Sequence, residues 1–136
     1  MQKEAALFKV LSDQTRLRLA CLLLFNGETC VCRLAEALNE PDFKISRHLG
    51  VMRSAGMVRA RRQGTWIYYR LVKPRSRLAQ SLHDFLYEGM VNDRTLKKDL
   101  ERLSKTSCGE PGRHAKKARR GEHDKGRGAP DDGHEG

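Results

Sequence analysis

The sequence contains neither a membrane span nor a secretion signal. No apolar run approaches the roughly 20 residues that cross a bilayer, and the N-terminal residues lack a signal-peptide pattern. A nucleophile–base constellation, a glycine-rich phosphate loop and a thioredoxin-like βαβ context are also lacking. These absences predict a soluble, cytoplasmic protein that is not an enzyme, needs no organic cofactor and has no membrane partner.

Cysteine is scarce, and the four cysteines present do not form the pattern of a disulfide framework. Cys30 and Cys32 are only two residues apart, so a disulfide between them could not link distant elements. A reducing cytosol would also keep both cysteines as thiols. The pair is therefore expected to bind a metal or to undergo redox chemistry. Cys21 stands among leucines, which favours a small core residue. The fourth cysteine is Cys108.

Large apolar residues are absent from the C-terminal part of the chain. Residues 105–136 contain seven of the 12 glycines and no Leu, Ile, Val or aromatic residue. Such a segment cannot offset the entropy of ordering, so we expect a disordered, basic and glycine-rich tail. We expect residues 1–92 to form the folded domain, with a possible helical extension over 93–104.

Positive charge is in excess. The chain has 27 Lys and Arg residues against 17 Asp and Glu residues, a net charge of +10. Residues 1–104 alone hold 19 basic and 11 acidic residues, a net charge of +8, so the tail is not the source of the basic character. Such a field attracts phosphate backbones or anionic membranes.

Hydrophobic periodicity predicts a mainly α fold. Apolar residues recur every three or four positions in successive stretches, as in amphipathic helices. Asp13 is expected to cap the second helix, Asn26-Gly27 to end it, and Asp42 to cap the fourth. The expected helices lie around Ala5–Leu11, from Asp13 to Asn26, over Cys30–Leu38, from Asp42 to Gly56, around Leu78–Met90 and, more weakly, through Leu96–Leu103.

A β-hairpin is expected after the fourth helix. Val58–Arg62 and Thr65–Leu71 are short runs joined by Gln63-Gly64, and the second run is rich in strand-forming residues. Helix, helix, short turn, helix and then a basic hairpin is the order of a winged helix-turn-helix. A body this small buries limited surface alone, and dimerisation is a common remedy.

The fourth helix and the hairpin predict a surface for double-stranded DNA. If Ile45, Leu49 and Met52 point inward, the basic side chains of that helix point outward. Such side chains can bind phosphates and form hydrogen bonds with base edges in the major groove. The tip of a basic hairpin can bind the DNA backbone. The predicted DNA-binding residues are Lys44, Ser46, Arg47, His48, Arg61, Arg62, Gln63 and Thr65.

Three segments, Glu28–Leu34, Lys44–Leu49 and Arg62–Leu71, resemble the ArsR/SmtB family of metal-responsive repressors. The resemblance runs from about Ala6 to Leu86. It implies a homodimer, joined mainly through its first helix and the helix expected around Leu78–Met90, that represses an operon until its ligand binds. Cys30-Val31-Cys32 is similar to the arsenic-sensing branch, which implies that Cys30 and Cys32 bind As(III) or Sb(III) as the inducer.

Two positions depart from the arsenic-sensing pattern. Arg33 and Ala35 stand where that pattern has an aspartate and a third cysteine. Trigonal As(III) therefore lacks a third protein sulfur nearby in the sequence. The alternatives are that Cys108 is the third ligand, from the tail of either protomer, that a small-molecule thiol serves, or that two sulfurs suffice.

The spacing of the two thiols predicts a mechanism. Residues two apart on a helix are separated by roughly 200° around its axis. Because both belong to the helix expected over Cys30–Leu38, one ion cannot comfortably be held by Cys30 and Cys32 while the first turn stays regular. Ion binding is therefore expected to unwind or re-aim the start of this helix, which packs on the DNA-reading helix.

Other interpretations remain open. A Cd(II)- or Pb(II)-responsive repressor of the same fold would use the same soft thiolates. A thiol redox switch would replace metal binding by oxidation of Cys30 and Cys32. A nucleic-acid packaging protein would share the charge and the fold, and a specific operator footprint would exclude it.

Overall fold

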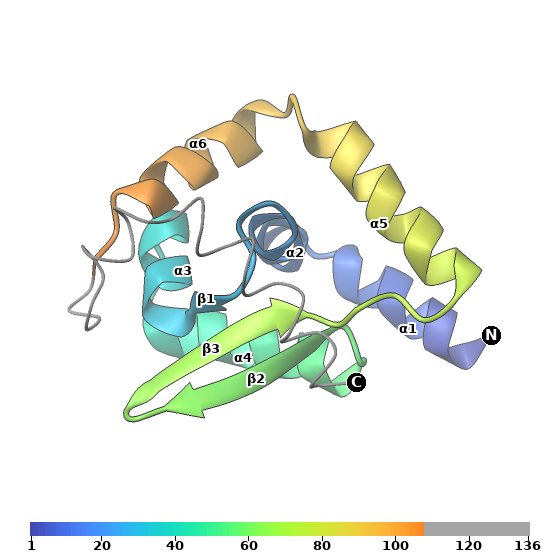
Figure 1. Ribbon diagram of the computed structural model, residues 1–136, viewed down its shortest axis with the longest axis horizontal. Coiled ribbons are helices and arrows are strands. Elements are labelled where there is room, and N and C mark those ends of the chain that lie inside the picture. Colours follow the sequence, from blue (N-terminus) through green and yellow to red (C-terminus); the bar gives the residue numbers. More distant parts are fainter. Residues whose placement is uncertain (108–136) are drawn as a thin grey trace. The chain divides into compact units, whose positions relative to one another are not determined.

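The computed structural model describes residues 1–107 (Figure 1). No helix within these residues is long and apolar enough to cross a membrane. The elements are α1 (Gln2–Leu11), α2 (Gln14–Asn26), β1 (Thr29–Cys30), α3 (Val31–Leu38), α4 (Asp42–Ser54), β2 (Val58–Gln63), β3 (Trp66–Leu71), α5 (Arg77–Met90) and α6 (Arg94–Ser104). The predicted winged helix-turn-helix, mainly α with a β-hairpin, is confirmed.

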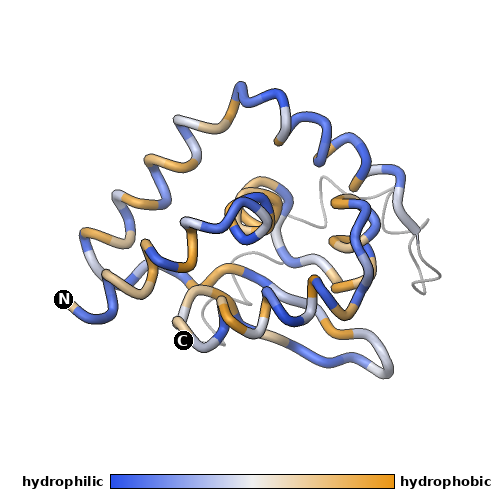
Figure 2. Tube along the Cα trace, turned by 180° about the vertical axis from the view of Figure 1, so that it is seen from behind, coloured by the Kyte–Doolittle hydropathy of each residue, from blue (hydrophilic) through white to orange (hydrophobic). Residues whose placement is uncertain are grey.

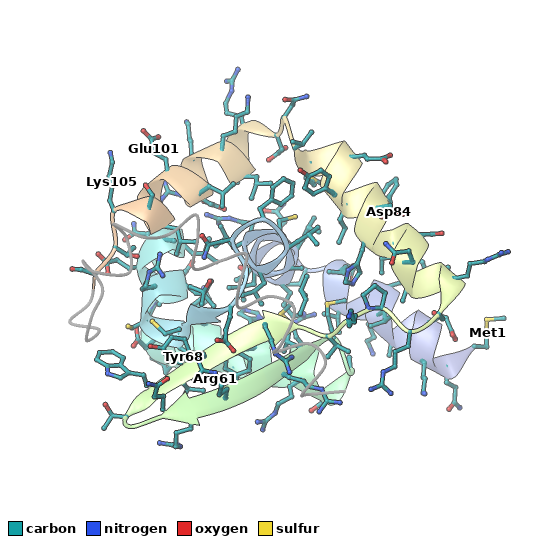
Figure 3. All side chains as sticks on the ribbon, viewed as in Figure 1. Met1, Arg61, Tyr68, Asp84, Glu101 and Lys105 are labelled. Atoms are coloured by element: carbon teal, nitrogen blue, oxygen red, sulfur yellow. The ribbon has the colours of Figure 1, made fainter. Side chains whose placement is uncertain are left out.

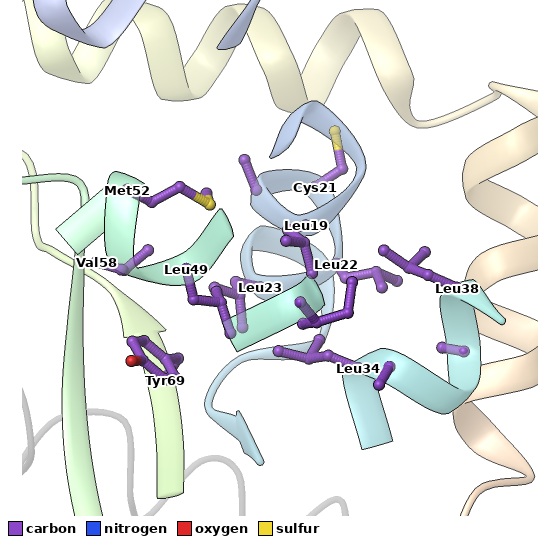
Figure 4. Close-up of a cluster of buried hydrophobic side chains, with 14 of the residues drawn as sticks. Leu19, Cys21, Leu22, Leu23, Leu34, Leu38, Leu49, Met52, Val58 and Tyr69 are labelled. Carbon is purple, nitrogen blue, oxygen red and sulfur yellow. The ribbon is translucent and has the colours of Figure 1, made fainter. Parts of the chain in front are cut away.

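The core is built around α2, which contacts α1, α4, α5, α6 and β3. Leu19 and Leu22 of α2 are fully buried, and Figure 4 shows them among leucines of α3 and α4. Burying one such side chain stabilises the fold by about 1.5–3 kcal/mol. Cys21 is 3% exposed, as expected of a core residue.

The sequence signals for helix ends agree with the structure in part. Asp13 caps α2, because its carboxylate accepts a hydrogen bond from the Arg16 backbone N–H at 3.0 Å. Gly27 ends the helix with φ 87°, a conformation that favours glycine. Asp42 is not the N-cap of α4: it is the first helical residue, and Pro41 precedes it. A carboxylate there still interacts favourably with the helix dipole.

The sheet has one strand more than the sequence predicted. β1 pairs with β3, and β3 pairs with β2, all antiparallel, in the order β1-β3-β2. In this register Cys30 lies opposite Tyr68. Gln63 lies opposite Trp66, so the two loop residues of the hairpin are Gly64 and Thr65. The two-residue strand β1 was missed because it is too short to show alternation.

The weakly predicted last helix, α6, packs against α2 and α3. Its residues Leu96 and Leu103 are buried and belong to the core. Asp99 of the same helix is fully buried and accepts two hydrogen bonds from Arg18 of α2, each at 2.9 Å, and one from Arg102 at 2.6 Å. Figure 2 shows apolar and polar residues alternating along α5 and α6, as in amphipathic helices.

Candidate functional site

The helix-turn-helix consists of α3, a short turn and α4. The turn begins at Asn39, whose φ of 58° lies in the left-handed region that asparagine tolerates. Ile45, Leu49 and Met52 of α4 are all fully buried, as the sequence predicted. Their burial turns the opposite face of α4 outward.

The outward face of α4 carries the predicted DNA-binding residues in two different environments. Ser46 and Arg47 are exposed. Lys44 and His48 are half-buried, and the Lys44 Nζ lies 3.1 Å from Glu40 Oε1. The surface available to DNA is therefore centred on Ser46 and Arg47, with Lys44 held by an exposed ion pair that a phosphate could replace.

His48 faces the start of α2. Its Nδ1 lies 3.4 Å from Nη1 of Arg16, whose Nε donates a hydrogen bond to the Val10 carbonyl at 2.9 Å. Burial, as the main cause, lowers the pKa of His48 below 6.5, while the nearby Asp13 opposes this shift. A neutral His48 at pH 7 follows, and a neutral imidazole serves DNA as a hydrogen-bonding group rather than as a charge.

The tip of the hairpin is exposed at Arg62, Gln63 and Thr65. Arg61 differs from them. Its guanidinium forms a paired contact with Glu28, with Nη2–Oε1 at 2.7 Å and Nε–Oε2 at 3.2 Å, and lies 4.6 Å from the centre of the Tyr68 ring. Figure 3 shows Arg61 and Tyr68 together at the hairpin. Arg61 therefore ties the hairpin to the residue before β1, a role that the sequence did not reveal for Glu28.

The two cysteines of the Cys-Val-Cys element lie where the hairpin sheet meets the helix-turn-helix; Cys30 is a reduced thiol and Cys32 is disulfide-bonded. Cys30 is the last residue of β1 and the N-cap of α3, with extended φ −78° and ψ 155°, and is 1% exposed. Cys32 is in the first turn of α3 and half-buried. The two Sγ atoms are 3.5 Å apart.

The premise for expecting an unwound helix is contradicted by the structure, while a shift of the helix start on ion binding stays a prediction. The premise was a helical Cys30, whereas α3 begins at Val31. The extended backbone of Cys30 turns its side chain toward that of Cys32. Two sulfurs bound to one ion at about 2.3 Å each lie no more than about 4.6 Å apart. The observed 3.5 Å satisfies that limit, so the two sulfurs are near enough for one thiophilic ion once Cys32, which is disulfide-bonded in this structure, is reduced.

The third ligand predicted as a possibility, Cys108, lies outside the described residues. Within residues 1–107, no group of three or more His, Cys, Asp or Glu side chains is placed to hold a metal ion.

Arg33 is buried beside the thiols, with 8% of its surface exposed. Its Nε donates to Thr106 Oγ1 at 2.8 Å, and its Nη2 donates to the Leu103 carbonyl at 3.2 Å. The Thr106 hydroxyl itself donates to the Leu103 carbonyl at 2.7 Å. The guanidinium therefore binds the C-terminal end of α6, where unpaired carbonyls and the helix dipole favour a cation. No local pattern in the sequence predicts this long-range contact.

Helices α1 and α5 expose large apolar side chains. Phe8 of α1 is 55% exposed, and Phe85 and Tyr87 of α5 are 69% and 51% exposed. Exposed apolar residues gathered on one pair of helices are typical of a protein–protein contact.

Comparison with known proteins identifies the family that this chain resembles. The model described as "Bacterial regulatory protein, arsR family" matches residues 13–60. The arsenic resistance transcriptional regulator ArsR2 of Pseudomonas putida is 58% identical over 64 residues, 47% of this chain and 56% of that protein. The arsenical resistance operon repressor of Bacillus subtilis is 38% identical over 71 residues, 52% of this chain and 68% of that protein.

A cadmium-related protein is also similar. The cadmium resistance transcriptional regulatory protein CadC homolog of Staphylococcus aureus is 37% identical over 67 residues, 49% of this chain and 55% of that protein. The chain thus spans about half the length of several curated relatives that it matches. These relatives are named as regulators or repressors of transcription, not as enzymes.

Solved structures share the fold. The repressor BigR from Xylella fastidiosa superimposes with a TM-score of 0.53 at 36% identity, covering 64% of this chain and 85% of that chain. HlyU from Vibrio cholerae superimposes with a TM-score of 0.58 at 26% identity, covering 67% of this chain and 95% of that chain.

Proposed function

Because the chain belongs to the ArsR family of bacterial regulatory proteins, we propose that it is a homodimeric transcriptional repressor in the cytoplasm. It binds double-stranded operator DNA and releases it when As(III) or Sb(III) binds Cys30 and Cys32. The observation that carries the proposal is the 3.5 Å separation of the two Sγ atoms at the junction of the hairpin and the helix-turn-helix. Cys30 and Cys32, once both are reduced, would hold the ion through their soft thiolates.

The DNA contacts of the proposal come from two elements. Ser46 and Arg47 of α4 would enter the major groove, with Lys44 and His48 at the edge of the contact. Arg62, Gln63 and Thr65 at the hairpin tip would contact the backbone or minor groove. Arg61, held by Glu28, would fix the direction of the hairpin. Each protomer would then bind DNA through both α4 and the hairpin tip, and these two elements must keep a fixed separation.

Cys30 belongs to the connection between those two places. Its strand β1 pairs with β3 of the hairpin opposite Tyr68, and the same residue caps α3, which packs on α4. Any displacement of Cys30 on ion binding therefore shifts the hairpin relative to α4. Because a dimer places two such units one helical turn of DNA apart, about 34 Å, both half-sites lose their fit together. A tenfold loss of affinity needs only about 1.4 kcal/mol of coupling.

The dimer would form through α1 and α5. Their exposed apolar side chains, Phe8, Phe85 and Tyr87 among them, are the surface that a second copy would cover. The family resemblance implies the same helices.

Cd(II) or Pb(II) is the second candidate for the inducer, because a cadmium resistance regulator is among the relatives and the same thiolates bind these ions. Oxidation of the neighbouring thiols is a third possibility that the same assay separates.

Fluorescence anisotropy on DNA from upstream of the gene tests the proposal. The protein is titrated under reducing conditions with arsenite, antimonite, cadmium, lead and zinc, and separately with peroxide. Release by arsenite or antimonite that is lost in Cys30→Ser and Cys32→Ser is the expected result. The control Cys21→Ala removes a core thiol and should keep the response. Release by cadmium or lead alone would select the second candidate, and tight binding that no metal relieves would refute the inducer assignment.

A further inference from the structure

Phe43 is a large apolar side chain that the fold leaves in contact with water. It is the second residue of α4 and is 69% exposed, whereas Ile45, two residues further on, is fully buried. Positions two apart on a helix are separated by about 200° around its axis, so Phe43 lies on the side of α4 opposite Ile45. Packing in the core therefore does not account for a phenylalanine at this position.

Phe43 shares its face of α4 with two residues of the proposed DNA surface. Arg47 follows four positions later, about 40° around the axis, and Ser46 three positions later, about 60° in the other direction; both are exposed. Gly50, one turn beyond Arg47, adds no side chain to this stripe. The exposed Asp42 lies about 100° from Phe43, away from Arg47. The face is thus polar and basic, with one large apolar group at its N-terminal end.

The first turn of α4 holds Phe43 in a fixed position. The Pro41 carbonyl accepts hydrogen bonds from the backbone N–H groups of Lys44, at 3.1 Å, and Ile45, at 3.2 Å. The buried side chain of Ile45 anchors the same turn in the core. The ring is therefore presented by a rigid helix start, and little backbone freedom is lost when it meets a partner.

The chemistry of this face matches the major groove of DNA. Among the hydrogen-bonding base edges of that groove, the apolar group is the C5-methyl of thymine. A recognition helix brings its N-terminal residues to the base edges, and Phe43 is at that end of α4. An apolar protein partner would instead require a contiguous apolar patch. The excess of basic over acidic residues favours the same partner.

We propose that Phe43 is a specificity-determining residue that contacts the methyl group of one thymine in each half-site of the operator. This inference rests on the proposed function, because it names a base that the proposed DNA surface reads. Ser46 and Arg47 supply hydrogen bonds and charge at neighbouring positions. Phe43 adds a preference that hydrogen bonds cannot supply, since thymine and uracil present the same donors and acceptors and differ only in the methyl group.

Replacing thymine by uracil in the DNA tests this contact. The operator is first located by footprinting the upstream DNA with the full-length protein under reducing conditions. Each thymine of a half-site is then replaced by uracil together with its symmetry mate, and affinity is measured by fluorescence anisotropy. At one such pair, uracil should weaken wild-type binding about 15-fold, or about fourfold for each methyl group. Phe43→Ala should bind the thymine and uracil duplexes of that pair equally.

Two further variants control for folding and for apolar surface in general. Val51→Ala is the matched control, because Val51 is another exposed apolar side chain of α4, at 41%, but lies eight residues beyond Phe43. It should keep the wild-type ratio of thymine to uracil affinity. Phe43→Leu, which remains apolar, should retain part of that ratio. Circular dichroism should show the same Tm for Phe43→Ala as for wild type, since the side chain is exposed.

The outcomes separate the inference from the proposed function. Specific operator binding by wild type with equal affinity for thymine and uracil at every position would overturn the inference and leave the proposed function standing. The same ratio in wild type and Phe43→Ala, or a ratio lost in Val51→Ala and kept in Phe43→Ala, would also overturn it. If wild type gives no footprint on the upstream DNA, the proposed function is refuted and the inference with it.

Discussion

Replacing Asp99 by alanine should destabilise the protein strongly, because this carboxylate joins α6 to α2. It is fully buried and accepts two hydrogen bonds from Arg18 and one from Arg102. The Arg102 Nε also binds the Ala37 carbonyl at 2.6 Å, so the network extends to α3. Removing one partner of a buried pair costs about 3–5 kcal/mol. The Arg18 and Arg102 side chains remain 30% and 46% exposed and can regain water, which lowers the expected loss to about 3 kcal/mol.

Thermal and urea unfolding followed by circular dichroism, at equal protein concentration, measure this loss. For a folded body of this size, about 3 kcal/mol lowers Tm by roughly 12–24 °C. The matched control is Glu101→Ala on the same helix, whose carboxylate is 69% exposed and lies 4.0 Å from Lys105 Nζ; it should change stability by less than about 0.5 kcal/mol. A loss below about 1 kcal/mol for Asp99→Ala, or one equal to that of the control, would refute the account of how α6 is attached.

Three further predictions concern DNA binding and pH. Glu28→Gln should weaken operator binding about three- to tenfold without changing arsenite affinity, because it loosens Arg61 and the hairpin; anisotropy beside calorimetry checks both, and unchanged DNA affinity would contradict it. If Arg62 binds a phosphate, Arg62→Ala should lower by about 1 the slope of log K for DNA binding against log salt concentration. An unaltered slope would show that Arg62 does not bind the DNA backbone. Burial lowers the pKa of His48 and His83 below 6.5, so the unfolded state binds protons first and stability should fall as pH drops below 6.5. Urea unfolding at pH 7.5 and 5.5 should show a smaller loss of stability at the lower pH in His48→Gln than in wild type. An equal loss in both proteins would refute the role of His48 in the pH dependence.

The helices could be predicted because their signals are local. The spacing of Ile45, Leu49 and Met52 identified the buried face of α4, and Asp13 and Gly27 marked the ends of α2. Each depends on a few neighbouring residues, which a sequence displays directly. The same holds for the hairpin strands, whose limits differ from the prediction by one residue at each side of the turn.

The features missed by the sequence all depend on partners far along the chain. β1 is recognisable only from its pairing with β3, and that pairing makes Cys30 extended rather than helical. The resulting approach of Cys30 to Cys32 removed the reason for expecting an unwound helix. The hydrogen bond between Arg33 and Thr106 spans 73 residues, and the Glu28–Arg61 pair spans 33. Such contacts are fixed by tertiary packing, on which local spacing carries no information.

The affinity for arsenite, measured on the free protein and on the protein saturated with operator DNA, tests the central claim most directly. If the thiol pair is coupled to the DNA-binding elements, thermodynamic linkage requires that DNA weaken arsenite binding by the same factor by which arsenite weakens DNA binding. The account predicts a factor of at least about ten in both directions, abolished in Cys30→Ser. Equal arsenite affinity with and without DNA would contradict it.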